Sequence, residues 1–337
     1  MTSFDYIRLD HGSGGKLSHR LIEELFLPHF INDPLKKLDD SAVISLSHKK
    51  VAFTTDSYVV DPLFFPGGDI GKLAVCGTVN DIAMSGAVPM YLSAGFIIEE
   101  GFPINKLERI IISMKNAASE ADIDIVTGDT KVVPKGKADQ LFINTAGIGI
   151  ILDNADISSA NAQIGDTIIL SGYIGDHGIA VMSKREGLSY KTEIESDVAP
   201  LHAIIKDLIQ GGIEIHSLRD PTRGGLASSL NEIAAKSSVG IIIEEEKIPV
   251  RKEVAGVCDL LGFDPLYVAN EGKFIAVLPA HHAAEALGII KTHKYGKNAA
   301  IIGNVTEEHE KRVILNTAIG GKRIIDMLTG EQLPRIC

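Results

Sequence analysis

Short runs rich in β-branched residues alternate with amphipathic helical stretches along most of the chain. The run VAFTT at 51–55 precedes the helical pattern KLAVCGTVNDIAMSGA at 72–87, and MYLSAGFII at 90–98 precedes KLERIIISMKNAASEA at 106–121. The same mixture returns in the second half, from TIILSG at 167–172 onward. A repeated alternation of strand and helix is typical of layered α/β and α+β architectures, which is the fold class that we predict.

The length of the chain and one polar stretch predict two domains. A single hydrophobic core rarely serves 337 residues, and the pattern resets through DNADISSANAQIGD at 153–166. The last stretch, RIIDMLTGEQLPRIC at 323–337, has the Gly and Pro of a tail rather than the pattern of a core helix. We therefore predict an N-terminal domain at 1–155, a C-terminal α+β domain at 156–326 and a mobile tail at 327–337.

Composition excludes several classes of partner and compartment. A net charge of −11 argues against a general nucleic-acid or anionic-membrane surface, because both require clustered Lys and Arg. The first residues, MTSFDYIRLD, lack a signal pattern, and no apolar run reaches the roughly 18 residues of a membrane span. Three cysteines without a C-x-x-C pair form neither a disulfide framework nor a zinc site. We expect a protein of the reducing cytoplasm with no export and no anchor.

The last residue is a cysteine, and it differs from the other two. Cys76 and Cys258 lie in apolar helical patterns, so burial is expected for both. Cys337 lies ten residues beyond Met327, a distance that an extended tail spans at roughly 33–36 Å, so its thiol can enter a pocket or leave it. The carboxylate on the same residue should raise the pKa of the thiol, and attack on an electrophile would need a base or a partner.

Aspartates follow several of the apolar runs. Carboxylates that emerge at the same sheet edge repel one another, and a hard cation such as Mg²⁺, shared with phosphates, would neutralise them. Any one of these residues could instead be a helix cap or a turn residue. The candidates are Asp39, Asp40, Asp56, Asp81 with its neighbour Asn80, Asp129 and Asp220.

Other residues suit phosphate or proton chemistry less specifically. The segment HGSGGKL, with Gly14, Gly15 and Lys16, could close over phosphates at a helix start, although it matches no standard nucleotide motif and could be a linker. Lys131 and Glu271 could act on a phosphate or a proton, or be a solvated lysine and a turn acid. For His177, in the segment GDHG, we expect a cap or surface position.

Seven segments occur in an order that resembles one family over essentially the whole chain. They are HGSGGK, DDSAV, the run from TTDSYVV to AMSGA, GDTKVV, DPTRGGLA, NEGK and the final PRIC. The set is similar to the HypE family of hydrogenase maturation factors, which are carbamoyl dehydratases. The resemblance implies the two-domain fold of aminoimidazole ribonucleotide synthetase and selenophosphate synthetase, and a homodimer formed through the N-terminal domain.

The resemblance also implies a reaction. A partner carbamoyltransferase, HypF, would place a carbamoyl group on Cys337 as an S-carboxamide, and ATP would then drive its dehydration to a thiocyanate. The cyanide would pass to the iron of a nickel-iron hydrogenase on a scaffold complex of HypC and HypD. Lys131 would stabilise charge on the transferred phosphate, and Glu271 would accept a proton.

The same resemblance implies the cofactor ligands, ATP with Mg²⁺. The implied metal ligands are Asp40, Asp56, Asp81, Asp129 and Asp220. The implied nucleotide contacts add Asp39, Asn80, Gly14, Gly15 and Lys16 to these.

Two kinds of alternative stay open at this point. Another ATP enzyme of the same fold would be selenophosphate synthetase, which places Cys or selenocysteine in its N-terminal Gly-rich segment, or thiamine-monophosphate kinase, which needs no terminal thiol. HGSGGKL contains no cysteine. A non-catalytic binding module would use Cys337 only for mixed disulfides and would not hydrolyse ATP in a carbamoyl-dependent way.

Overall fold

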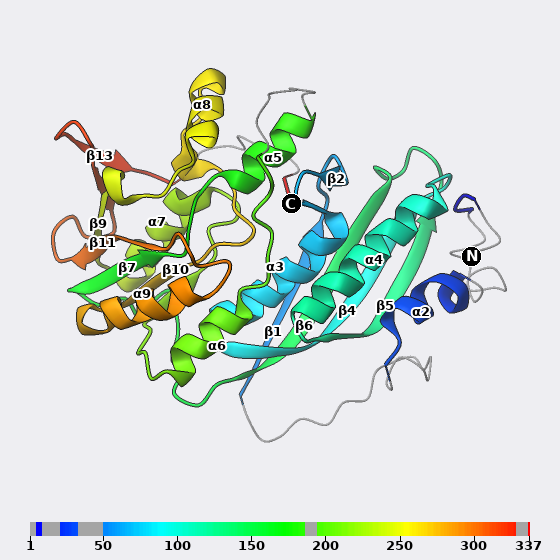
Figure 1. Cartoon of the computed structure of the whole chain (residues 1–337), viewed down its shortest axis with the longest axis horizontal. Helices are drawn as coiled ribbons and strands as arrows, with labels where there is room; N and C mark the ends of the chain where they lie inside the picture. Colours follow the sequence, from blue (N-terminus) through cyan, green and yellow to red (C-terminus); the bar gives the residue numbers. More distant parts are fainter. Residues whose placement is uncertain (1–4, 9–20, 33–49, 186–193, 328–335) are drawn as a thin grey trace.

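The computed structural model describes residues 5–8, 21–32, 50–185, 194–327 and 336–337. Strand and helix alternate through two domains that lie side by side, and the C-terminal residue lies near β2 between them (Figure 1). Gly14, Gly15, Lys16, Asp39 and Asp40 lie outside the described residues.

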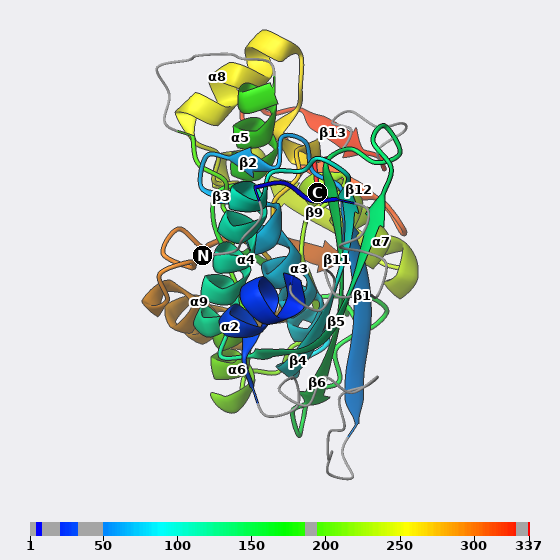
Figure 2. The same ribbon diagram turned by 90° about the vertical axis from the view of Figure 1, so that its right-hand side faces the viewer.

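The N-terminal half forms a four-stranded sheet in the order β1-β6-β4-β5, with only the β4–β5 pair parallel. Helices α2, α3 and α4 lie on one side of this sheet (Figure 2). The elements are the π-helical turn η2 (Ile22–Phe26), α2 (Leu27–Phe30), β1 (Val51–Tyr58), β2 (Phe64–Phe65), β3 (Gly68–Asp69), α3 (Ile70–Met84), β4 (Ala87–Glu99), α4 (Ile104–Glu120), β5 (Asp124–Val133) and β6 (Leu141–Ile151).

Helix α3 is the buried centre of this half. Its N-cap is Asp69, whose carboxylate accepts hydrogen bonds from the backbone N–H groups of Gly71 and Lys72 at 2.8 and 3.1 Å. Every residue of α3 is buried except Lys72 and Asp81. Such a helix is apolar around its circumference because it packs against other elements on all sides. Asp81 is therefore the one carboxylate that this helix presents to a partly open space.

The other face of the first sheet is apolar and open. Residues of β1 alternate in exposure, as expected for a strand with one covered face. Val51, Phe53 and Ile97 are exposed on this sheet, and Phe53 has a relative exposure of 71%. The register places Phe53 beside Ile148, which in turn pairs with Tyr91, so apolar side chains continue across three strands.

The C-terminal half forms a seven-stranded sheet in the order β13-β12-β9-β11-β7-β10-β8. Its elements are β7 (Asp166–Leu170), α5 (Asp176–Arg185), α6 (His202–Gln210), β8 (Ser217–Arg219), α7 (Gly225–Ser237), β9 (Gly240–Glu244), η4 (Glu245–Lys247), α8 (Lys252–Leu261), η5 (Pro265–Tyr267), β10 (Ile275–Pro279), η6 (Ala280–His282), α9 (Ala283–Thr292), β11 (Ala300–Thr306), β12 (Val313–Asn316) and β13 (Lys322–Ile325).

This second sheet has a hydrophobic core on each face. On β7, Ile168 and Leu170 pack in the core that contains α7, whereas Ile169 packs in the core that contains α6 and α9. Strand β10, which pairs with β7 and β8, alternates in the same way. A strand buried on both faces reads as a continuous apolar run, which explains the run TIIL at 167–170.

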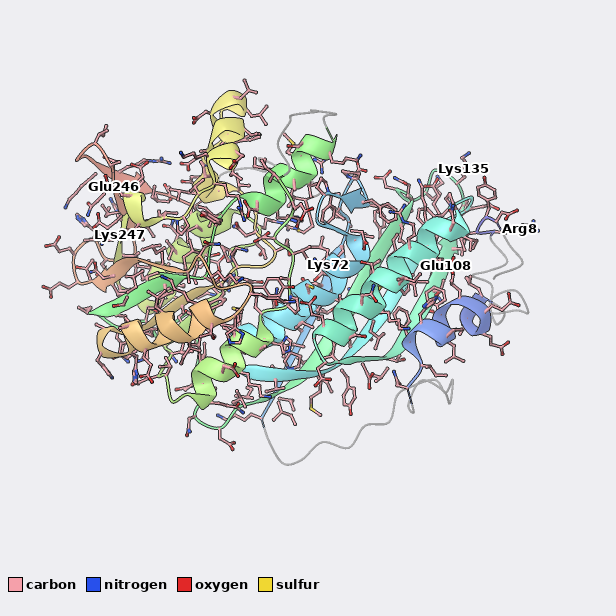
Figure 3. All side chains as sticks on the ribbon, viewed as in Figure 1. Arg8, Lys72, Glu108, Lys135, Glu246 and Lys247 are labelled. Carbon is pink, nitrogen blue, oxygen red and sulfur yellow. The ribbon has the colours of Figure 1, made fainter. Side chains whose placement is uncertain are left out.

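The chain forms one more strand just before the predicted tail at 327–337. Residues 323–325 belong to β13, which pairs antiparallel with β12, and the side chain of Ile325 is buried. Three exposed side chains followed by a buried one gave no clear strand alternation in the sequence. Charged side chains lie on the outer surfaces of both domains, among them Glu108 and Glu246 (Figure 3). Within the described residues, no helix has the length and apolar character that a membrane span requires.

Candidate active site

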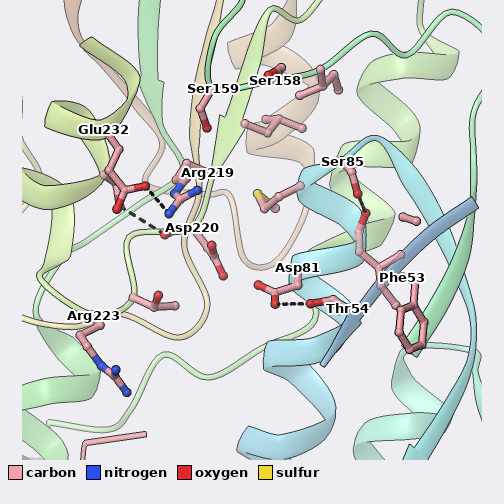
Figure 4. A pocket seen from close by; sticks show the side chains of 17 residues that line it. Phe53, Thr54, Asp81, Ser85, Ser158, Ser159, Arg219, Asp220, Arg223 and Glu232 are labelled. Carbon is pink, nitrogen blue, oxygen red and sulfur yellow. Dashed lines mark hydrogen bonds and ion pairs between the residues drawn. The ribbon is translucent and has the colours of Figure 1, made fainter. Parts of the chain in front are cut away.

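A pocket of about 480 Å³ lies between the two domains and has carboxylates on both sides. Asp81 enters it from α3, and Asp220 enters it from the loop after β8 (Figure 4). Thr54 on β1 donates a hydrogen bond to Asp81 at 3.0 Å. The loop then turns through Gly224 and Gly225, both with positive φ, where α7 begins. At Gly225 a Cβ would lie 2.6 Å from the carbonyl oxygen of Leu266.

The carboxylates of the site raise one another's pKa. Burial raises the pKa of Asp81, and the charges of Asp220 and Asp56 raise it further. The pKa of Asp220 is also raised, mainly by burial. Carboxylates that resist ionising together favour a cation among them. Within the described ranges no group of three His, Cys, Asp or Glu side chains could hold a metal ion by itself. The oxygen-only chemistry of the site suits Mg²⁺, which keeps waters and shares phosphate oxygens.

Glu271 lies in a buried loop that Asp197 organises. One carboxylate oxygen of Asp197 accepts the backbone N–H of Glu271 at 3.1 Å, and the other accepts the ammonium of Lys273 at 3.1 Å. Although burial opposes it, the Lys273 charge and these hydrogen bonds lower the pKa of Asp197. Glu271 itself is buried, and its Oε1 has no hydrogen-bond partner among the described residues. Burial, followed by the charge of Asp220, raises the pKa of Glu271 well above its usual value.

The C-terminal thiol lies at this site. Cys337 Sγ is 3.6 Å from Nη2 of Arg223, in the loop that also carries Asp220. A main-chain oxygen of Cys337 accepts the N–H of Val59 at 3.1 Å, just beyond β1. Burial, followed by the charge of Glu271, raises the pKa of the Cys337 thiol to about 11. The sequence predicted the direction of this shift, but it gave the terminal carboxylate as the cause, whereas burial is the larger one.

The other two cysteines behave as predicted. Cys76 and Cys258 are both fully buried. Burial raises the pKa of the Cys76 thiol to about 12 and that of Cys258 to about 11.

Some predicted site residues lie elsewhere. The amide of Asn80 is buried and donates to the carbonyl oxygens of Ala199 and Glu271, while its Oδ1 accepts the N–H of Leu201 at 2.8 Å. These bonds join α3 to the C-terminal domain. A nucleotide contact for Asn80 therefore stays a prediction that would have to displace one of them.

Asp129 and Lys131 lie on β5, at the opposite edge of the first sheet from β1. They form an exposed ion pair at 3.3 Å, with 67% and 64% of their side chains accessible. Three strand spacings separate β5 from β1, roughly 14 Å at about 4.8 Å each. Within one chain these two residues thus lie apart from the pocket, and their predicted roles remain predictions.

Three residues of the site were missed from the sequence. Arg223 lies within the segment DPTRGG, in which Asp220 was the predicted site residue. Asp197 sits in the polar segment ESDVAP, which resembles a loop. His177 was expected at a cap or on the surface and is instead fully buried, so that expectation was wrong. The position of His177 beside glycines was typical of a turn. The neighbouring residues contain no signal for a partner far along the chain.

Comparisons with known proteins agree on the fold. The family model for AIR synthase related protein, N-terminal domain, matches residues 38–151, and that for the C-terminal domain matches residues 163–316. The thiamine monophosphate kinase of Aquifex aeolicus shares the fold with a TM-score of 0.63 at 20% identity, covering 90% of this chain and 99% of its own. The predicted two-domain fold is confirmed, and the kinase alternative is reduced to a distant likeness of fold.

Closer similarity is found to one group. The carbamoyl dehydratase HypE of Rhizobium leguminosarum bv. viciae is 55% identical over 332 residues, which are 98% of this chain and 95% of the relative. A crystal structure of the hydrogenase maturation protein HypE in complex with ATP has a TM-score of 0.95 at 51% identity, over 98% of this chain and 99% of that one. A structure of a HypE–HypF complex contains a chain that is 52% identical, with a TM-score of 0.81 over 91% of this chain and 99% of that one.

Proposed function

Since the chain belongs to the HypE family of carbamoyl dehydratases, we propose that it uses ATP to dehydrate an S-carboxamide on Cys337 to a thiocyanate. The observation that carries the proposal is the place of the Cys337 sulfur, next to Arg223 and within electrostatic reach of Glu271 and Asp56. A binding module that only forms mixed disulfides has no use for a thiol seated among carboxylates.

The chemistry needs a better leaving group and a place for protons. The amide oxygen attacks the γ-phosphorus of ATP, so that ADP departs and the oxygen becomes a phosphate ester. Two N–H protons then leave the nitrogen, and phosphate departs from carbon as the nitrile forms. The balance is thiocyanate, ADP, phosphate and one proton from one carbamoyl group and one ATP.

The chain's own residues divide this work. Glu271, buried with an unpartnered oxygen, has the raised basicity of a proton acceptor once it is ionised. The guanidinium of Arg223 lies at the sulfur, where it can orient the carbamoyl oxygen by donating to it. Asp197 fixes the loop that carries Glu271 through the bonds described above.

We propose ATP with Mg²⁺ as the cofactor, and the residues present fit it. Asp56, Asp81 and Asp220 offer only hard oxygen ligands and repel one another without a counter-charge. A cation held there would neutralise the phosphates and draw electrons from the transferred phosphorus. The predicted contacts at Asp39, Asp40, Gly14, Gly15 and Lys16, outside the described residues, would add to this set.

The thiol needs two positions. Seated in the pocket with a pKa near 11, it is almost entirely protonated at neutral pH and is a poor nucleophile. Charging with the carbamoyl group therefore takes place with the tail outside, where HypF acts, and dehydration takes place with the tail inside. Transfer of the cyanide to iron on the HypC–HypD scaffold again requires the sulfur to leave.

We also propose a homodimer through the open face of the first sheet. The exposed Phe53, Val51 and Ile97 lie on strands of this sheet, and an isologous pairing would cover an apolar surface of this kind. Asp129 and Lys131 are also exposed on this sheet. In a dimer, Asp129 and Lys131 could approach the pocket of the second copy, since the pocket of their own chain is out of reach.

The reactivity of the Cys337 thiol outside its pocket supports a cytoplasmic location. A thiol that must leave its pocket to be charged would be oxidised in a disulfide-forming compartment. Stable partners for the other two cysteines are also lacking, because both are free and buried.

Mass spectrometry of the C-terminal peptide tests the function. With ATP, HypF and a carbamoyl donor, the peptide should first gain one carbamoyl group and then lose one water. Cys337→Ala should show neither change while it still binds ATP. Water loss that proceeds without ATP, or cyanation that continues in Cys337→Ala, would contradict the proposal.

A further inference from the structure

Besides the contact of the Cys337 sulfur with Arg223, the fold holds the last two residues at three further points. The side chain of Ile336 is buried, with 4% exposure, in the core cluster shared by both domains. The carbonyl oxygen of Ile336 lies 2.8 Å from Nε2 of His177, and a main-chain oxygen of Cys337 accepts the N–H of Val59. His177 is the only side chain among these backbone contacts, because Val59 contributes its main chain.

The hydrogen-bond pattern fixes the state of His177. A carbonyl oxygen can only accept, so Nε2 of His177 carries the proton that it donates to Ile336. Nδ1 lies 2.8 Å from Oγ of Ser196, and that hydroxyl oxygen also accepts the N–H of Val198 at 3.2 Å. In a neutral ring that carries its proton on Nε2, Nδ1 accepts the proton of the Ser196 hydroxyl. Burial lowers the pKa of His177, which agrees with the neutral form.

The ring is also fixed in orientation. Phe65 meets the imidazole edge to face, with ring centroids 5.4 Å apart and planes at 89°. Phe65 is buried, so the ring has a packed partner on one side and hydrogen bonds at both nitrogens. A side chain restrained in this way can hold residues 336 and 337 at one defined depth.

We propose that Ser196 and His177 form a latch that seats the C-terminal tail, with Ser196 setting the tautomer of His177 and His177 binding the carbonyl oxygen of Ile336. They are positioning residues, since neither touches the sulfur. The latch lies one residue before the reacting cysteine, so it sets how far the Cys337 sulfur reaches toward Arg223. Its role in turnover rests on the proposed function, but its existence does not.

Alkylation of the three cysteines tests the latch without any turnover. Cys76 and Cys258 are fully buried and report unfolding, whereas Cys337 reports release of the tail. Removing one neutral hydrogen bond should increase the released fraction by about two- to tenfold. We therefore expect His177→Phe and Ser196→Ala to speed iodoacetamide labelling of Cys337 by that factor while Cys76 and Cys258 stay protected.

Two matched variants sharpen the result. His177→Gln keeps an amide donor near the position of Nε2 and should restore slow labelling at least in part. Ser171→Ala also removes a buried hydroxyl that accepts a backbone N–H, from Phe274 at 2.9 Å, but Ser171 lies away from the tail and should leave Cys337 slow. If His177→Phe unfolds and exposes all three cysteines, Ser196→Ala decides. Labelling of Cys337 in Ser196→Ala at the rate of the parent protein would overturn the latch.

A second measurement separates a positioning role from a merely structural one. With HypF, ATP and a carbamoyl donor, the latch variants should be carbamoylated as fast as the parent or faster, because charging takes place outside. Dehydration of the charged protein in a single turnover should slow by at most about two- to tenfold, with the full factor reached only where the charged tail is mostly released. Equal slowing of both steps would overturn the positioning role. If no water is lost even in the parent, the proposed function fails while the labelling result still stands.

Discussion

Gly77, in the middle of α3, gives the sharpest test of how the site is packed. A Cβ added there would lie 2.3 Å from the hydroxyl oxygen of Tyr58 and 3.2 Å from its Cε1. Ordinary contact begins at 3.4 Å, so the tyrosine hydroxyl would have to retreat by 1.1 Å. Tyr58 is buried, and its hydroxyl donates to the Asp56 carboxylate at 3.2 Å and lies 3.3 Å from Oγ1 of Thr78.

Gly77→Ala should therefore destabilise the protein even though alanine is the better helix former. Overpacking of a core costs about 1–3 kcal/mol, and the strained bond from Tyr58 to a charged carboxylate adds about 1.5 kcal/mol or more. The gain in helix propensity offsets only about 0.5–1 kcal/mol. We expect a net loss of about 1.5–4 kcal/mol, together with weaker binding of Mg-ATP because Asp56 is displaced.

Gly256→Ala is the matched control. Gly256 lies within α8, and a Cβ there meets nothing within 4 Å, so alanine should stabilise the protein by about 0.5–1 kcal/mol. Urea denaturation of both variants gives the comparison, and nucleotide titration gives the second readout. Equal stabilisation by both substitutions would refute the packing argument, because it would mean that Tyr58 yields without cost.

Three further predictions follow from other contacts. Asp197→Asn removes the charge that pairs with the buried Lys273, and breaking such a pair should cost about 3 kcal/mol in urea denaturation; a loss below about 1 kcal/mol would contradict this. Phe53→Arg should convert the proposed dimer to a monomer in light scattering, whereas Ile112→Arg, on the exposed side of α4, should not. The thiolate absorbance of Cys337, measured as the difference from Cys337→Ser, should titrate near pH 11 rather than near 9. Because the pKa of the Cys337 thiol is raised in the folded state, the protonated thiol favours the seated tail below about pH 9. This contribution to seating is lost as the pH rises toward 11. A titration midpoint at or below pH 9 would place the sulfur in solvent.

The fold was predictable from the sequence because its signals are local. The apolar runs at 167–170 and 275–279 have the length of strands, and the helical pattern at 72–87 ends with Ser85 and Gly86 where α3 ends. Ranges such as 1–155 and 156–326 stay predictions at the level of single residues. The strand at 322–325 escaped because its alternation is too short to be seen without its partner β12.

The site was predictable only in part, because its contacts join distant residues. Asp81 and Asp220 could be recognised as carboxylates beside small residues, and the structure brings them to one pocket. Asp197 was invisible because its role is to bind a loop 74 residues further on. His177 was misjudged for the same reason, since its partner Ile336 is 159 residues away.

The hydrogen bonds of Asn80 have a consequence for how the enzyme opens. They tie α3 to residues 199–201 and to the loop at 271, and the apolar core cluster runs without a break from α3 and β1 into α5 and α8. Two domains that are joined along α3 in this way are poorly suited to hinge motion relative to each other. Access to the pocket would then depend on movement of the last residues of the chain, while the two domains keep their relative position. Time-resolved scattering should accordingly show unchanged molecular dimensions through the catalytic cycle. A contraction that brings the two domains together would contradict this expectation.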